Sequence, residues 1–86
     1  MSRGFAVLGA GSWGTALALH LGRIGHEVSL WARDATLAQE IQRTRHNSRY
    51  LSECELPAAV RCTSDLAVAV EGAQFVVFAL PPTAQY

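Results

Sequence analysis

The chain has 86 residues, of which 50% are hydrophobic and 16% are charged. Seven arginines balance seven acidic residues and lysine is absent, so the formal net charge is zero and no overall field attracts a polyanion. This composition is typical of a folded, core-forming segment, and it argues against a disordered or nucleic-acid-binding chain.

The first predicted element is a short apolar strand, Phe5–Leu8, followed by a turn with the sequence Gly9-Ala10-Gly11-Ser12-Trp13-Gly14. Glycines at this spacing allow a tight turn at Gly9, close approach of a pyrophosphate at Gly11 and close helix packing at Gly14. The unpaired N–H groups at the start of the next helix would attract negative charge without a basic side chain. The turn therefore predicts a dinucleotide-binding site, with a glycine loop in some other α/β protein as the alternative.

A helix is predicted directly after this turn, because apolar residues recur at spacings of three and four. They are Trp13, Ala16, Leu17, Leu21 and Ile24. Gly25 is placed to end this helix, and Glu27–Ala32 is predicted to be a second strand. A strand, a glycine turn, a helix and a second strand are the context in which such a turn binds a dinucleotide.

Arg33 and Asp34 follow the second strand, where a dinucleotide-binding fold reads the adenosine ribose. An acidic residue there binds the ribose 2′-hydroxyl, whereas an arginine accommodates a 2′-phosphate. Asp34 has a competing structural task as the N-cap of the next helix. The pair therefore favours NADP and leaves NAD open, with the alternative that Arg33 is a solvated surface residue and Asp34 only a cap.

A second helix is predicted over residues 35–44, with its buried face formed by Leu37, Ala38 and Ile41. The arginine-rich stretch Arg43–Arg49 comes next. Because it is short and lies in a neutral chain, a solvated surface is favoured over a nucleic-acid patch. Residues 50–57 are predicted to be irregular, and residues 60–62 to form a short strand.

The last predicted helix covers residues 65–70, with Ser64 as its cap and Gly72 at its end. Residues 74–80 form the final strand, which is apolar at nearly every position and is expected to be the most deeply buried strand, before Pro81-Pro82 stops it. Four strands joined by right-handed crossovers predict a parallel sheet of order 3-2-1-4. The predicted fold class is α/β, a Rossmann-type parallel sheet with flanking helices.

Length and the remaining residue types complete the sequence-based expectations. A complete doubly wound dinucleotide fold needs about twice this length, so residues 1–86 are expected to be its first half, a partial and truncated domain. Cys54 and Cys62 are too few for a disulfide framework, and no cysteine or histidine spacing suggests a metal site. No secretion signal or membrane span is recognised, and a cytoplasmic location is expected.

Residues 6–18, Ala-Val-Leu-Gly-Ala-Gly-Ser-Trp-Gly-Thr-Ala-Leu-Ala, resemble the opening of bacterial NAD(P)-dependent glycerol-3-phosphate dehydrogenases. The tryptophan inside the glycine turn is the specific part of this resemblance. The resemblance continues through Gly25–Val28, Leu30–Arg33, Asn47 with Tyr50-Leu51, Leu56-Pro57, and Thr63 with Asp65-Leu66, up to Pro81. It departs from the family pattern at Asp34, Ser52, Gln74, Pro82 and Tyr86. The chain would correspond to about the first quarter of such an enzyme.

The resemblance implies that Ser12, Trp13 and Tyr50 contact the cofactor together with the glycine turn, and that Arg33 and Asp34 meet its adenosine end. It implies reversible hydride transfer between NAD(P)H and dihydroxyacetone phosphate, giving sn-glycerol 3-phosphate for phospholipid synthesis. The catalytic lysine of the family belongs to a later helical domain that is absent from this chain, so no catalytic residue is assigned and the chain alone is expected to be inactive. The expected partners are the dinucleotide cofactor and, in the parent enzyme, a small phosphorylated substrate and a second copy as a homodimer.

Two alternatives remain open at this point. One is the cofactor half of another NAD(P)-dependent dehydrogenase of similar fold, against which Trp13 and the Asn47/Tyr50 pattern argue. The other is a nucleotide-sensing module without enzymatic activity.

Overall fold

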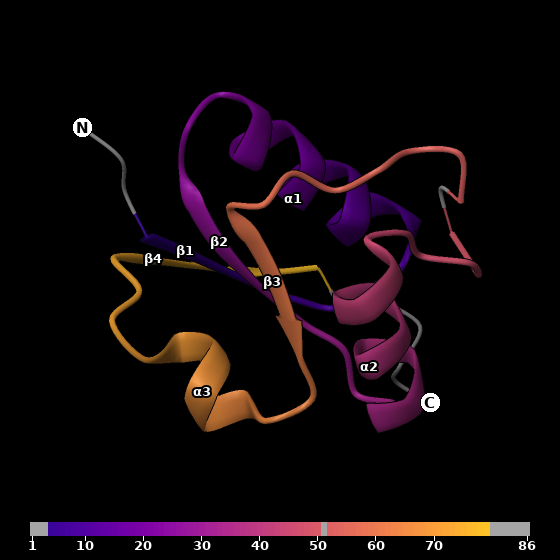
Figure 1. The fold of residues 1–86 in the computed structure, drawn as a ribbon. Helices are drawn as coiled ribbons and strands as arrows, with labels where there is room; N and C mark the ends of the chain where they lie inside the picture. The colour runs from indigo at the N-terminus through magenta and orange to yellow at the C-terminus, as the bar shows by residue number, and fades with distance from the viewer. Residues whose placement is uncertain (1–3, 51, 80–86) are drawn as a thin grey trace.

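The computed structural model describes residues 4–50 and 52–79, which form one parallel sheet with helices on both of its faces (Figure 1). In chain order the elements are β1 (Gly4–Leu8), α1 (Ser12–Arg23), β2 (Glu27–Trp31), α2 (Ala35–Thr44), β3 (Val60–Thr63), α3 (Leu66–Val70) and β4 (Phe75–Phe78). The strand order is β3-β2-β1-β4 and all three pairings are parallel. The predicted Rossmann-type fold and strand order are therefore confirmed.

Two apolar layers lie on opposite faces of the sheet because successive side chains of a strand point in opposite directions. Val7 of β1 and Leu30 of β2 belong to the larger layer, which also contains buried residues of α1 and α2. Ala6 and Leu8 point the other way and pack with Ala69 of α3. The helix face predicted for residues 35–44 is confirmed, since Leu37, Ala38 and Ile41 are all buried.

The buried face of α1 differs from the predicted stripe. Residues 13, 16 and 24 are exposed, whereas Leu21 is buried and Leu17 is partly buried against the core. Three small residues at a spacing of four, Gly14, Ala18 and Gly22, face the sheet instead. A Cβ atom at Gly22 would lie 2.6 Å from a methyl carbon of Val60, so at this position the helix lies too close to the sheet for a larger side chain. Glycine carries no signal in a hydrophobicity pattern, so the pattern does not reveal the face that Gly14 and Gly22 form.

The cap of α3 is Asp65, not the predicted Ser64. The Asp65 side chain accepts hydrogen bonds from the backbone N–H groups of Ala67, at 3.0 Å, and Val68, at 3.3 Å. The helix consequently begins one residue later than expected, at Leu66. Both residues are good N-caps, and the sequence alone favours neither strongly.

β4 is an edge strand, and its apolar side chains are exposed. The sequence predicts it to be the most deeply buried strand, yet Phe78 is 71% exposed and Phe75 46% exposed. Burial of a parallel strand depends on layers that cover both faces, and α3 lies over β1, β2 and β3 in the described part of the chain. Leu80 and the proline pair that follows lie outside the described residues.

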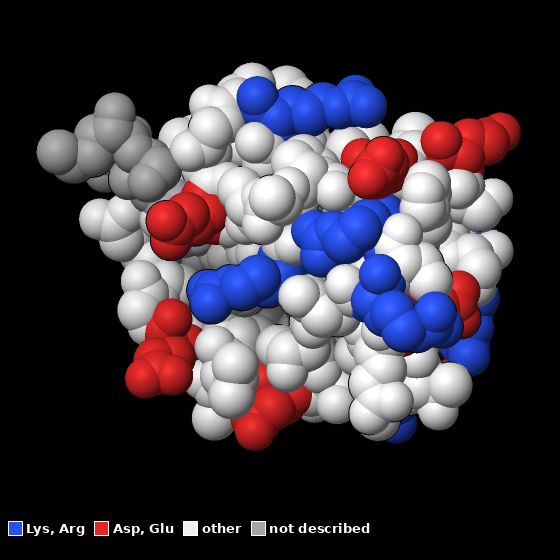
Figure 2. Space-filling view, viewed as in Figure 1, with Lys and Arg blue, Asp and Glu red and all other residues white. Residues whose placement is uncertain are grey.

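Charged groups are interspersed on the face shown in Figure 2, in agreement with the neutral composition. Among the described residues there is no cluster of side chains suited to a metal ion, and no helix has the length and apolar character needed to cross a membrane. Both cysteines are free thiols, and burial raises the pKa of Cys62 to about 11. The Cys62 thiol therefore stays protonated at neutral pH.

We expect the chain of residues 1–86 to self-associate through β4, because an apolar strand at a sheet edge is a template for pairing with another copy. Analytical ultracentrifugation over a range of concentrations should show oligomers. The substitution Phe78→Lys should shift the distribution toward monomer, since a charged edge opposes pairing, and Leu66→Lys on the outer surface of α3 is the control. A monodisperse monomer for the unsubstituted chain would contradict this expectation.

Candidate cofactor site

A cleft of about 610 Å³ lies at the carboxyl ends of β1, β2 and β4. In open parallel sheets, ligands bind at this edge, outside the ends of the strands. The wall of the cleft comes from the glycine turn, the segment after β2, the first turn of α2, the loop after α2 and the end of β4. Its lining residues are Gly9 to Trp13, Trp31 to Asp34, Leu37, Arg49, Tyr50, Phe78 and Ala79.

The three glycines of the turn have three different physical roles. Gly9 has a φ of 126°, a conformation that residues with a side chain rarely adopt. A Cβ atom at Gly14 would lie 1.8 Å from the carbonyl oxygen of Gly9, so only glycine permits α1 to begin so close to the strand that precedes it. A Cβ atom at Gly11 would meet nothing within 4 Å, because this residue borders the open space of the cleft.

The N-terminus of α1 is left open toward the cleft. Gly11 is its N-cap and supplies no side-chain hydrogen bond, and the first turn contains no acidic residue. In α2 and α3, by contrast, Asp34 and Asp65 accept hydrogen bonds from the backbone of the first turn. The free N–H groups and the positive end of the α1 dipole are therefore available to a phosphate group.

Asn47 holds the loop after α2 against the glycine turn. Its side chain is completely buried, and its Nδ2 atom donates to the carbonyl oxygen of Ala10, at 3.0 Å, and to Oγ1 of Thr15, at 2.9 Å. Its Oδ1 atom accepts from the backbone N–H groups of Arg49, at 3.1 Å, and Tyr50, at 3.2 Å. All four hydrogen-bonding positions of the amide are thus used, and both of the loop residues in the cleft wall are fixed relative to the turn.

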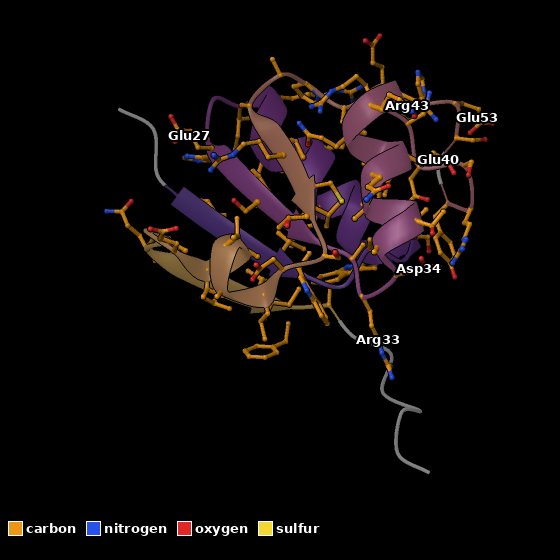
Figure 3. The ribbon with its side chains drawn as sticks, turned by 60° about the horizontal axis from the view of Figure 1, so that its bottom comes forward. Glu27, Arg33, Asp34, Glu40, Arg43 and Glu53 are labelled. Carbon is orange, nitrogen blue, oxygen red and sulfur yellow. The ribbon has the colours of Figure 1, made fainter. Side chains whose placement is uncertain are left out.

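Asp34 uses its two carboxylate oxygens for different partners. Oδ1 caps α2 by accepting from the N–H groups of Thr36, at 2.9 Å, and Leu37, at 3.3 Å. Oδ2 accepts from the Arg49 guanidinium at 2.8 Å. The hydrogen bond from Arg49, followed by those from the two N–H groups, lowers the pKa of the Asp34 carboxyl. Figure 3 shows Asp34 at the start of α2, whereas the Arg33 side chain extends away from the sheet.

The structure brings together every predicted site residue except Gly14. Gly9, Gly11, Ser12, Trp13, Arg33, Asp34 and Tyr50 all line the same cleft. Trp13 is 60% exposed and lines the cleft, so its ring is not part of the core beneath α1. Gly14 is buried behind the turn and contributes to the site through packing.

The arginine-rich stretch after α2 is not the uniform solvated surface that the sequence favoured. Arg45, which ends α2 with a φ of 67°, donates from its guanidinium to the carbonyl oxygens of Pro57 and Val60 and so ties the loop to β3. Arg49 lies in the cleft wall. The spacing of the arginines in the sequence does not distinguish Arg45, which binds backbone carbonyls, from Arg49, which lines the cleft. The sequence feature that points to Arg49 is its position directly before Tyr50.

The sheet order, the glycine turn and the cleft at the strand ends define a dinucleotide-binding domain of the Rossmann class. Residues 4–85 match the family described as NAD-dependent glycerol-3-phosphate dehydrogenase N-terminus, and the chain belongs to this family. This is the family that the sequence resembles, and the NAD or NADP cofactor predicted from the sequence agrees with the cofactors named for the family and its relatives.

Individual relatives agree with this assignment. The chain is 50% identical over 76 residues to a glycerol-3-phosphate dehydrogenase [NAD(P)+] of a Thermoanaerobacter species, and this match covers 88% of the chain and 23% of that enzyme. It is 55% identical, also over 76 residues, to the enzyme of the same name from a Chelativorans species, again over 88% of the chain and 23% of the relative. The chain thus spans about a quarter of the length of these relatives.

The fold is also that of a solved relative. The crystal structure of glycerol-3-phosphate dehydrogenase from Coxiella burnetii superposes with a TM-score of 0.85 at 39% sequence identity, covering 90% of this chain and 24% of that one. A Plasmodium falciparum glycerol-3-phosphate dehydrogenase gives a TM-score of 0.80 at 27% identity, over 94% of this chain and 25% of its own.

Two glycine substitutions should separate binding from folding. Gly11→Val adds a side chain at the border of the open cleft, where a Cβ atom meets no protein atom within 4 Å, so we expect only a small change in the free energy of unfolding together with loss of nucleotide binding. Gly14→Ala forces its methyl group against the Gly9 carbonyl and should lower the free energy of unfolding by at least about 2 kcal/mol. Urea unfolding and calorimetric titration with NADPH measure the two effects. Unchanged NADPH affinity in Gly11→Val would refute the role assigned to this turn.

Asn47→Ala should destabilise the protein by about 2–3 kcal/mol, because it leaves buried donors and acceptors of the turn and the loop unpaired. Asn47→Asp is the matched variant, since one oxygen of its carboxylate still accepts from the loop N–H groups, whereas the other cannot donate to Ala10 or Thr15 and is repelled by the Ala10 carbonyl oxygen. It should therefore weaken the attachment to the turn while retaining the local loop structure. Hydrogen exchange of the Tyr50 amide distinguishes them: protection should be lost in Asn47→Ala and largely kept in Asn47→Asp.

Proposed function

We propose that residues 1–86 form the cofactor-binding part of an oxidoreductase that interconverts sn-glycerol 3-phosphate and dihydroxyacetone phosphate with NAD(P)(H), and thereby feeds glycerophospholipid synthesis. The observation that carries this proposal is the open N-terminus of α1 beside Gly11, at the base of a cleft lined by the predicted cofactor residues. Family membership supplies the reaction class.

The residues of the cleft fit a dinucleotide in chemical type. The N–H groups at Gly11 to Trp13 would hold the pyrophosphate, and a Cβ atom at Gly11 would meet no protein atom within 4 Å. Arg33 and Asp34 would meet the adenosine ribose, and the rings of Trp13 and Tyr50 offer apolar surface to the cofactor. These are the roles proposed for the eight predicted site residues, with Gly14 acting through packing.

The bound nicotinamide would supply the hydride chemistry, while the protein positions it against the substrate. Within this chain no lysine is present, and we assign it no catalytic residue. We propose that a further helical domain of the parent enzyme provides the catalytic lysine and the contacts to the small phosphorylated substrate, and that the parent is a homodimer. The free thiols of Cys54 and Cys62 accord with the cytoplasmic location that we also propose.

The direct test uses the complete gene product that contains residues 1–86. Dihydroxyacetone phosphate-dependent oxidation of NADPH and NADH is followed in parallel, and the chain of residues 1–86 is assayed in the same way. We expect turnover by the complete product and none by the chain alone, because the chain holds no catalytic group. Nucleotide binding by the complete product without oxidation of either cofactor would contradict the proposed reaction.

A further inference from the structure

The Asp34–Arg49 ion pair lies where the 2′ position of the adenosine ribose would bind. Arg49 belongs to the loop after α2, and the sequence pattern does not indicate that this residue lies near the ribose. Both residues line the cleft, and the Arg49 guanidinium lies 2.8 Å from Oδ2 of Asp34. They are fifteen positions apart in the sequence. Asp34 alone would favour a ribose 2′-hydroxyl and repel a 2′-phosphate.

We propose that Arg49 selects the cofactor by neutralising Asp34, so that the site accepts the 2′-phosphate of NADP although an acid stands next to Arg33. This inference rests on the proposed binding of a dinucleotide in the cleft, and it assigns a specificity-determining role to a residue outside the glycine turn and the β2 segment. Arg49 and Arg33 together would offer two guanidinium groups to the phosphate, which arginine binds through paired N–H donors.

The hydrogen bonds of Asp34 support the proposal that Arg49 neutralises this residue. Its Oδ1 atom is committed to the backbone of α2, which leaves only Oδ2 to interact with either Arg49 or a ribose hydroxyl. A 2′-hydroxyl must therefore share Oδ2 with Arg49. A 2′-phosphate, in contrast, offers Arg49 a second anionic partner without requiring anything from Asp34.

The attachment of Arg49 allows its side chain to act separately from the loop fold. Its backbone N–H is held by the buried Oδ1 atom of Asn47, so truncation of the side chain leaves this anchor in place. The ion pair itself is exposed, with 55% of the Arg49 side chain and 44% of the Asp34 side chain accessible. Exposed ion pairs contribute little to stability, and the guanidinium can exchange partners at low cost.

The test compares the Kd values of NADPH and NADH, measured by isothermal titration calorimetry on the complete gene product that contains residues 1–86. Arg49→Ala should raise the Kd for NADPH about tenfold and change the Kd for NADH less than about threefold, because the acid is then uncompensated. In the double variant Arg49→Ala/Asp34→Asn, part of the NADPH affinity should return, since asparagine still caps α2 but carries no charge. Arg43→Ala removes an arginine outside the cleft wall and should leave both Kd values unchanged.

The ratio of the Kd values for NADPH and NADH distinguishes a role of Arg49 in cofactor selection from a merely structural role. If Arg49→Ala raises the Kd for both cofactors by the same factor, or if the double variant regains no NADPH affinity, Arg49 does not select and the inference is overturned. If the unsubstituted chain and Arg43→Ala bind neither cofactor, the proposed cofactor site fails and the inference fails with it. Thermal midpoints measured for all variants identify any change in Kd that comes from unfolding.

Discussion

Asn47 joins the loop after α2 to the glycine turn through both hydrogens and both lone-pair positions of its buried amide. A buried amide is costly unless each of these positions has a partner, so the contact specifies one arrangement of loop and turn. Arg49 and Tyr50 stand in the cleft wall because of it. The glycine turn alone would offer a phosphate site, whereas the turn and the loop together line one cleft, which we propose to hold the rest of the nucleotide as well.

Close packing around the turn is the second constraint. Gly14 and Gly22 bring α1 so near to its neighbours that larger side chains would collide with the Gly9 carbonyl and with Val60. This approach directs the N-terminus of α1 to the strand ends, where its free N–H groups face the cleft. Trp13, in the first turn of α1, is exposed and forms part of the cleft wall. The small residues therefore position the site without contributing functional groups to it.

Local sequence signals predicted the fold well, because the glycine spacing and the alternation of apolar strands and helices leave few topologies for a parallel sheet. Seven of the eight predicted site residues line one cleft. Six of them lie next to the ends of β1 and β2, which the sheet brings together, and Tyr50 comes from the loop after α2. The sequence could not predict the Asp34–Arg49 pair or the four contacts of Asn47, which depend on how an irregular loop folds back. The sequence also predicts burial for β4, whose apolar side chains are exposed. An apolar run shows that a strand is suited to burial, but it does not show whether another layer covers the strand.

The central claim is that the cleft beside Gly11 binds the dinucleotide. Amide chemical shifts of the isotopically labelled protein, followed by NMR during titration with NADPH, test it most directly. The account predicts that the largest shifts occur at Gly11, Ser12 and Trp13, with further shifts at Arg33, Asp34, Arg49 and Tyr50. Shifts concentrated instead at the hollow between α2 and β3, which Gln42, Cys62 and Ser64 help to line, with the glycine turn unaffected, would contradict it.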